Sequence, residues 1–162
     1  KFEKYDYVVF NDVFEHLENL DMVINQIGMM LNKEGKILIN LPSSDGFLFK
    51  FSHILFKLGI TNFYDRLWQK NLSSPHLSYF NNSNLKLIFK KHGYNLIYSN
   101  YLNTISKTGN FKRLNSTIKN KLICFFITFF LMIFFYLQKI LSKDIIFHIY
   151  TKKKINQPSV TK

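Results

Sequence analysis

The 162-residue chain is long enough for one domain, and its 47% hydrophobic content is sufficient for a buried core. A formal net charge of +12 favours anionic partners in general, but the basic residues are dispersed and accompany no recognition motif, so specific nucleic-acid binding is not expected. The single cysteine, Cys124, excludes a disulfide framework and a CxxC metal motif, which predicts a reducing compartment, the cytoplasm.

The chain opens with a strand–helix–strand pattern. Residues 7–10 (YVVF) form a run of β-branched and aromatic side chains that is typical of a parallel strand buried on both faces. Asn19 or Asp21 can cap a following helix, whose apolar positions recur with a 3.6-residue period. Residues 36–41 then form a second short strand, which Pro42 terminates. This order predicts a parallel βαβ unit.

Three glycines are predicted to end helices in the left-handed conformation. Gly35 follows the first helix, Gly59 follows a very apolar helix at residues 47–58, and Gly93 follows an amphipathic helix at residues 84–92.

The remaining segments are assigned by composition. Residues 60–74 are predicted to be irregular, and Asn82 or Ser83 is expected to cap the amphipathic helix. Residues 94–98 and 144–151 have the β-branched and aromatic content of strands.

The segment 122–137 (LICFFITFFLMIFFYL) carries no charge, and its only polar side chain is Thr128. It is shorter than the ~20 residues that a membrane-spanning helix needs. Four lysines flank it, namely Lys119, Lys121, Lys139 and Lys143, as in segments that lie at a membrane interface. We therefore expect a helical insertion that contacts an anionic membrane surface, with a buried or oligomeric helix as the alternative.

Four motifs, in order, resemble the second half of class I S-adenosylmethionine-dependent methyltransferases. They are YDYVV at 5–9, VFEHL at 13–17, MLNKEGKILINLPS at 30–43 and HLSYFNNSNLKLIFKKHGY at 76–94. The resemblance covers residues 5 to about 101 and resumes at the last strand. It implies an α/β fold, a partial Rossmann-like methyltransferase sheet of the last four strands with a hydrophobic helical insertion before the final strand. The EH pair is similar to that of ubiquinone-pathway O-methyltransferases.

The resemblance also implies an activity, which is methyl transfer from S-adenosylmethionine to a small-molecule or lipid-linked acceptor. The family's glycine-rich cofactor loop is absent, since the chain has no GxGxG motif. We therefore expect a fragment that binds the cofactor poorly and is inactive alone. The alternative is a non-catalytic, membrane-associated module that keeps a methyltransferase-like half-sheet.

The domain organisation expected from these patterns has four parts. Residues 1–101 form the carboxyl-terminal part of the methyltransferase domain, residues 102–143 a basic linker and the hydrophobic insertion, residues 144–151 the final strand, and residues 152–162 a basic disordered tail.

The candidate catalytic residue is His16, because an oxygen acceptor benefits from a base near neutral pKa. The backbone of Phe10, Asn11 and Asp12, at the end of the first strand, is expected to line the cofactor cleft. The alternative for His16 is packing under the sheet edge.

Two further residues are candidates for acceptor binding. His76 lies in the HLSYF motif and would cover the acceptor, with a structural loop histidine as the alternative. Trp68 is a candidate substrate platform or a packing anchor. No metal is expected, although in the ubiquinone-pathway enzymes the residues that match Asp12, Glu15 and His16 bind a divalent cation.

Overall fold

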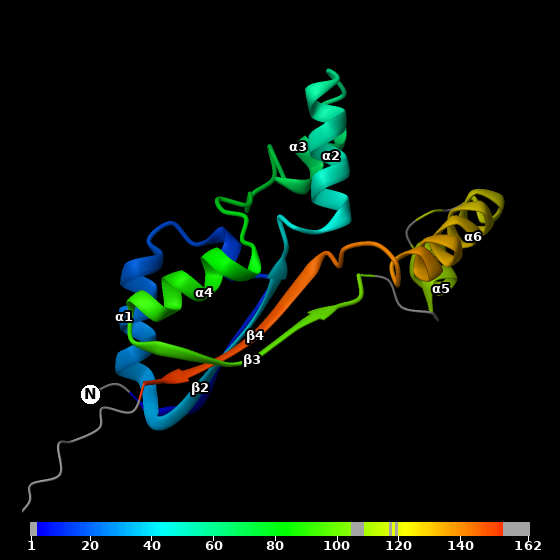
Figure 1. The fold of residues 1–162 in the computed structure, drawn as a ribbon. Coiled ribbons are helices and arrows are strands. Elements are labelled where there is room, and N and C mark those ends of the chain that lie inside the picture. The colour runs from blue at the N-terminus through cyan, green and yellow to red at the C-terminus, as the bar shows by residue number, and fades with distance from the viewer. Residues whose placement is uncertain (1–2, 105–108, 117, 119, 154–162) are drawn as a thin grey trace, which may run out of the picture.

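The computed structural model describes residues 3–104, 109–116, 118 and 120–153. Its four strands form one sheet in the order β1-β2-β4-β3 (Figure 1). β1 (Tyr5–Asn11) pairs in parallel with β2 (Leu31–Pro42), whereas β4 (Ile145–Lys152) runs antiparallel to both β2 and β3 (Tyr94–Leu102). The last strand therefore lies between two earlier ones. The expected α/β fold, with a half-sheet of four strands, is confirmed.

Two helices cover one face of this sheet. α1 (Leu20–Met30) and α4 (Asn82–Lys91) lie side by side, and Asp21 of α1 pairs with Lys91 and His92 at the end of α4 (Figure 1). The core between helices and sheet is built from fully buried side chains of both layers: Ile24, Ile27, Leu85 and Phe89 from the helices, and Ile37, Ile39, Ile146 and Tyr150 from the strands.

The helix starts show which capping predictions were right. The Asn19 side chain accepts a hydrogen bond from the Met22 amide at 3.0 Å, so Asn19 caps α1. α4 begins at Asn82, two residues earlier than predicted. Its cap is Asn81, not Asn82 or Ser83, and the side chains of Asn81 and Asn84 each accept the other residue's amide in a capping box.

The prediction for Gly35 is wrong. α1 ends at Met30, because Leu31 is already extended, and Gly35 lies within β2 without a positive φ. Gly35 is required for a steric reason instead. A Cβ at this position would lie 2.7 Å from Leu31 Cδ2 and 3.1 Å from the Tyr5 carbonyl oxygen. Gly59 and Gly93 do have positive φ, and each follows the helix that it was predicted to end.

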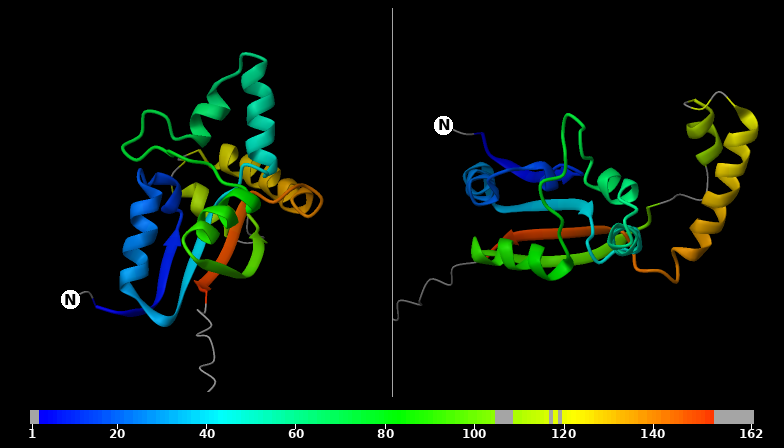
Figure 2. Two further views of the ribbon diagram at one scale, coloured as in Figure 1. Left: turned by 60° about the vertical axis from the view of Figure 1, so that its left-hand side comes forward. Right: turned by 90° about the horizontal axis from the view of Figure 1, so that it is seen from above.

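A helical pair, α2 (Phe47–Lys57) and α3 (Asn62–Leu67), projects beyond one end of the sheet (Figure 2). The prediction of an irregular segment at 60–74 is therefore wrong for its first half. α3 has only six residues and none is buried, so it lacks the apolar period that would identify it from sequence.

A second projection consists of α5 (Asn110–Asn115) and α6 (Lys121–Leu137), which carries the apolar segment (Figure 2). Phe134 of α6 packs on Phe47 at the start of α2, with ring centroids 6.0 Å apart. Among the described residues, no helix is both long and apolar enough to cross a membrane. Residues 105–108, 117 and 119 of the expected linker, and residues 154–162 of the expected tail, lie outside the described residues.

Candidate active site

The candidate site lies where the parallel strands β1 and β2 end. Asp12 follows β1 with a left-handed backbone (φ 52°), and its amide donates to the Asn40 carbonyl at 3.0 Å. Ser43 follows β2, and its amide donates to the Asp144 carbonyl at 2.7 Å. In open α/β sheets, ligands bind in the crevice outside the carboxyl ends of the strands. Asp12 and Ser43 therefore lie at the edge of the sheet where a ligand is expected.

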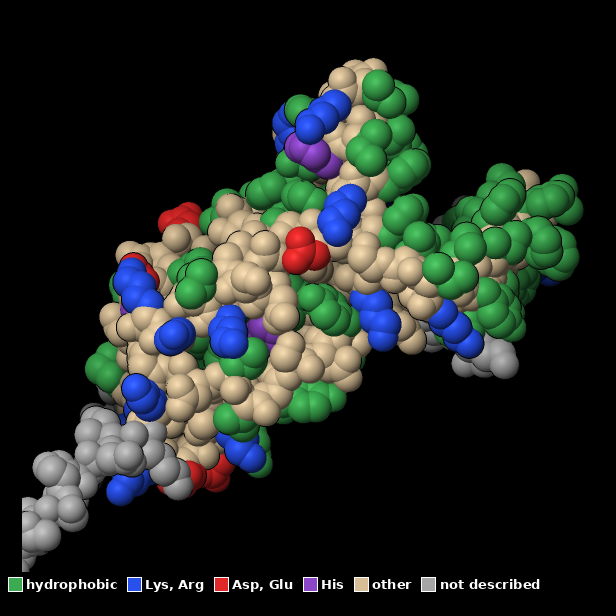
Figure 3. Space-filling model, in the orientation of Figure 1, with side chains coloured by type: hydrophobic (Ala, Val, Ile, Leu, Met, Phe, Trp, Pro, Cys, Tyr) green, Lys and Arg blue, Asp and Glu red, His purple; other side chains and the backbone are tan. Residues whose placement is uncertain are grey.

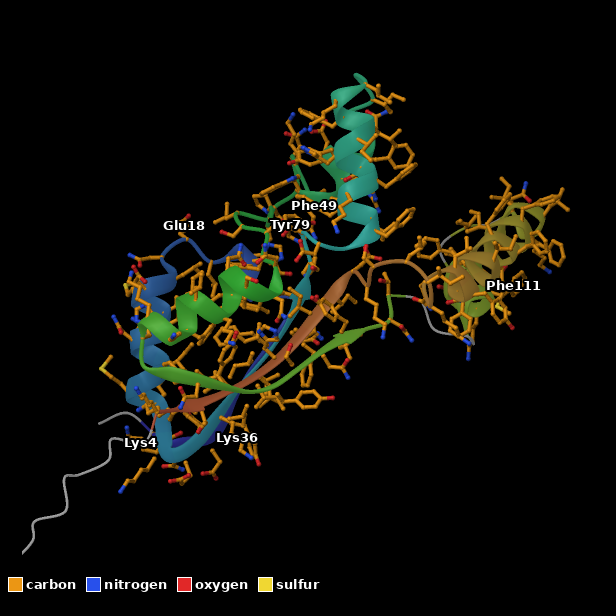
Figure 4. The ribbon with its side chains drawn as sticks, in the orientation of Figure 1. Lys4, Glu18, Lys36, Phe49, Tyr79 and Phe111 are labelled. Carbon is orange, nitrogen blue, oxygen red and sulfur yellow. The ribbon has the colours of Figure 1, made fainter. Side chains whose placement is uncertain are left out.

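A cavity of about 260 Å³ occupies this position. Its polar lining comes from Asp12, Arg66, Gln69, His76, Tyr79 and Asp144. Phe49 of α2 lies against Tyr79 above the ends of the strands, with ring centroids 4.6 Å apart (Figure 4). The cavity is thus bounded by the α2–α3 projection on one side and by the sheet on the other.

The loop that carries His76 is fixed to the loop that carries His16. The amides of Leu77 and Ser78 both donate to the Glu15 carbonyl, at 2.9 and 3.1 Å, and the His76 amide donates to the Trp68 carbonyl at 3.1 Å. These bonds bring two motifs 60 residues apart in sequence into one cluster. Glu15 and His16 themselves belong to a single turn of 3-10 helix, η1 (Phe14–His16).

Glu15, His16 and His76 form a compact group. The two imidazole rings meet edge to face with centroids 4.6 Å apart, and Glu15 Oε1 lies 4.0 Å from His76 Nε2. His16 Nδ1 lies 2.8 Å from the Pro75 carbonyl oxygen, which can only accept, so Nδ1 carries the proton and Nε2 the free lone pair.

Burial shifts the ionisation of this group. It raises the pKa of the Glu15 carboxyl, and the nearby Asp12 charge raises it further. Burial also raises the pKa of Asp12, although the neighbouring His16 opposes that shift. Burial lowers the pKa of His76, and the charge of His16 lowers it further. Shifted carboxyl and imidazole groups beside a cavity are typical of functional sites.

The other predicted site residues lie around this group. Phe10 is half-buried and packs on Phe14 in the core, with centroids 5.5 Å apart, so that its backbone rather than its ring is available to a cofactor. The Asn11 side chain accepts from Asn40 at 2.6 Å. Trp68 packs edge to face on Tyr79, at 4.9 Å between centroids, behind the wall of the cavity.

Sequence reasoning missed Arg66, Gln69 and Asp144 as lining residues. Gln69 has a left-handed backbone (φ 50°), and its side-chain amide nitrogen lies 3.0 Å from His76 Nε2. Neither Gln69 nor Arg66 belongs to a periodic pattern of apolar residues that would locate it from the sequence. Asp144 was recognised only as the start of a strand, because its contacts join segments that are distant in sequence.

A second, larger cavity of about 510 Å³ lies between α2 and α3. Its lining is mainly apolar and includes Phe51 and Phe63. Leu48, Arg66 and Leu67 line both cavities, so the two adjoin at these residues. The cavity at the strand ends therefore has a second cavity beside it.

Comparison with protein families identifies the class. Residues 1–99 match the family model described as a methyltransferase domain, so the chain belongs to that methyltransferase-domain family. A comparison with curated proteins found no match.

Solved structures show the same fold. One is a chain of the complex that contains the Haloferax volcanii Trm112 methyltransferase activator, with a TM-score of 0.55 and 10% identity over 97% of this chain and 58% of that one. The MccD protein has a TM-score of 0.51 and 16% identity over 94% and 63% of the two chains. A SAM-dependent methyltransferase from Archaeoglobus fulgidus has a TM-score of 0.50 and 16% identity over 93% and 61%. The chain therefore spans about three fifths of the length of each of these structures.

Proposed function

We propose that the protein transfers a methyl group from S-adenosylmethionine to a small-molecule or lipid-linked acceptor bound in the cavity at the ends of β1 and β2. The observation that carries this proposal is the family match over residues 1–99 together with a cavity at the strand ends, where Asp12 and His76 supply polar groups. When bound, the cofactor supplies an electrophilic methyl group, so the protein's main task is to align the acceptor with it.

The backbone of Phe10, Asn11 and Asp12 is the segment we assign to the cofactor. The left-handed turn at Asp12 directs the chain away from the sheet directly after β1, and Asp12 lines the cavity. The chain has no glycine-rich loop, so these residues supply only part of a cofactor site.

His16 is the residue we assign to proton removal from an oxygen acceptor. Its Nδ1 is held by the Pro75 carbonyl and lies 3.2 Å from the Ser74 hydroxyl, which leaves Nε2 to accept the proton. His76 lines the cavity, and Tyr79 Oη orients its ring from 3.1 Å. His16 is not itself one of the residues that line the cavity, but its ring contacts His76, which does. A base and a positioning group on adjoining loops are therefore proposed at the edge of the cavity.

The first prediction tests His16. In a full-length enzyme that contains this chain and the glycine-rich cofactor loop, His16→Ala should lower turnover by about tenfold or more, while the affinity for S-adenosylmethionine changes little, because the side chain acts on the acceptor rather than on the cofactor. Turnover is measured as transfer of a tritiated methyl group to lipid and small-molecule extracts, and cofactor affinity by calorimetry. His92→Ala is the control, since His92 pairs with Asp21 and neither residue lines the cavity. Equal turnover in wild type and His16→Ala would refute the assignment.

A membrane surface is the second part of the proposal. The exposed apolar side chains of α6 and of the α2–α3 pair gather on the two projections (Figure 3). Phe126 and Phe130 of α6 are 54% and 66% exposed, and Phe63 of α3 is 58% exposed. Soluble monomers rarely expose apolar patches larger than a few hundred Å². Phe63 lines the cavity between α2 and α3, which supports a lipid-linked acceptor on the cytoplasmic surface of a membrane.

A further inference from the structure

The Glu15 carboxylate is buried without a hydrogen bond. The residue is 1% exposed, and neither carboxylate oxygen has a hydrogen-bond partner among the described residues. An unpaired carboxylate in such a place is costly, and native proteins almost always pair buried charges or coordinate them to metals. The His76 Nε2 atom lies 4.0 Å from Oε1, which is too far for a hydrogen bond. Glu15 therefore lacks the partner that its burial demands.

His16 and His76, in their neutral forms, both carry a lone pair on Nε2 within the group that they form with Glu15. Tyr79 donates its hydroxyl proton to the Leu67 carbonyl at 2.8 Å, so its oxygen accepts from His76 Nδ1 at 3.1 Å. In the neutral ring the proton then lies on Nδ1, and the lone pair lies on Nε2, beside Glu15. The Pro75 carbonyl fixes His16 in the same tautomer. Both rings are thus oriented through Nδ1, as is usual for histidines that bind metals through Nε2.

The distances are close to those of a metal site. One ligand atom from each of Glu15, His16 and His76 lies within 4.8 Å of the other two. Four ligands at about 2.0–2.1 Å around a tetrahedral ion are roughly 3.3 Å apart. Closing the site therefore needs inward shifts of about an ångström, which side-chain rotations supply, and it displaces the Gln69 amide from His76.

We propose that Glu15, His16 and His76 bind a divalent transition-metal cation beside the acceptor cavity. Asp12, which the family resemblance suggested as the third ligand, is not a member of this group. Having His76 rather than Asp12 as the third ligand alters which metal the site favours. Two imidazoles and one carboxylate favour Zn²⁺, Co²⁺, Mn²⁺ or Fe²⁺, whereas an oxygen-rich set with Asp12 would suit Mg²⁺. This inference depends on the donor set and does not require methyl transfer. His16 Nε2 has one lone pair, so in the metal-bound protein His16 is a ligand and not the base assigned above.

The test is a titration of the tag-free, chelator-treated chain with CoCl₂, followed by visible absorption and calorimetry. We expect one equivalent of Co²⁺ to bind and to produce d–d absorption bands, with at least tenfold preference over MgCl₂. Glu15→Gln and His76→Gln should each weaken binding by at least tenfold. Asp12→Asn should leave the affinity within about threefold, and so should His92→Gln, the matched histidine of an exposed carboxylate–imidazole pair.

A second readout separates ligation from misfolding. Co²⁺ should raise the melting temperature of the wild-type chain, and it should have no such effect on Glu15→Gln, which without metal should melt no lower than wild type because it removes an unpaired buried charge. His16→Gln, at a half-buried position, provides the same comparison if Glu15→Gln fails to fold. Absence of Co²⁺ binding at 1 mM, or retention of binding in both Glu15→Gln and His76→Gln, would overturn the proposal. Loss of binding in Asp12→Asn alone would do the same.

Discussion

His148 is a buried histidine that serves the core rather than the candidate site. It is fully buried on β4, where its Nε2 donates to Asn82 Oδ1 at 2.5 Å and its Nδ1 accepts from the Tyr150 hydroxyl at 2.7 Å. The neutral ring thus satisfies both partners without a buried charge. Burial, with a smaller effect of Lys86, lowers the pKa of His148 to about 4.

This shift predicts how stability depends on pH. Between the ordinary histidine pKa of about 6.5 and the folded value of about 4, the unfolded chain binds a proton that the folded chain does not, so lower pH favours unfolding. The contribution of His148 to the free energy of unfolding should fall by about 2 kcal/mol from pH 7 to pH 5. Urea denaturation at both pH values measures the loss.

The comparison of variants isolates His148 from other titrating groups. His148→Gln should lose about 2 kcal/mol less than wild type over the same pH interval, because it removes the proton uptake. His53→Gln, on α2 and outside the sheet, should show the wild-type loss. An equal loss in wild type and His148→Gln would show that the ring is protonated in the folded protein.

At the scale of elements, Asp144 is the group that joins the α2 projection to the sheet. Its Oδ1 accepts from the Leu48 amide in the first turn of α2 at 2.7 Å, and its Oδ2 accepts from the Thr104 hydroxyl at 3.3 Å, just after β3. Gly46 is needed for this approach, since a Cβ there would lie 2.5 Å from Asp144 Oδ1. One carboxylate therefore positions both the helix above the cavity and the end of β3.

Asp144→Ala should destabilise the protein by about 1–3 kcal/mol, because it leaves the Leu48 amide at a partly buried helix terminus without its acceptor. Urea denaturation gives the value, and hydrogen exchange should show the loss concentrated in α2. Asp45→Ala, in the same turn, is the control and should cost less than 0.5 kcal/mol. A uniform loss of protection over the whole sheet would contradict the local role.

The regular elements were predictable because each carries its own periodic signal. The first βαβ unit, α2, α4 and β4 were expected within a few residues of their observed bounds. α3 and the role of Gly35 were not, because a six-residue helix without buried side chains has no period, and Gly35 is constrained by Tyr5, thirty residues earlier.

Only part of the candidate site could be predicted, because the rest depends on contacts between segments that are distant in sequence. Glu15 and His16 are neighbours in sequence, and the resemblance drew attention to both. Their proximity to His76 depends on the two amides that donate to the Glu15 carbonyl, which is a tertiary contact. The burial of the Glu15 carboxylate, on which the metal inference rests, has no sequence signal at all.

For the whole molecule, the two apolar projections predict binding to lipid. The protein should sediment with vesicles of phosphatidylglycerol and phosphatidylcholine. Phe126→Ser/Phe130→Ser should reduce the bound fraction at least tenfold, because each buried Phe contributes about 2 kcal/mol. Salt should weaken binding only in part, since apolar contacts are not screened. Phe134 is left unchanged because it packs on Phe47.

Leu87→Ser is the matched control for this prediction. Leu87 is 64% exposed, but it lies on α4, away from both projections, so its loss should not alter sedimentation. If the wild-type protein stays in the supernatant with these vesicles, α6 has another partner. If Leu87→Ser releases the protein as strongly as the α6 variant, the binding is not specific to the projections.

The position of β4 between β2 and β3 has a consequence for how the chain folds. During synthesis, β2 and β3 leave the ribosome well before residues 145–152, yet in the sheet each pairs with β4 rather than with the other. Until β4 is synthesised, the edges of β2 and β3 that pair with it have unpaired backbone groups. Unpaired strand edges of this kind promote association between chains. Pairings as distant as Lys36 with Thr151 give a high contact order, which is typical of slow folding. A chaperone that holds the nascent chain would act during this interval.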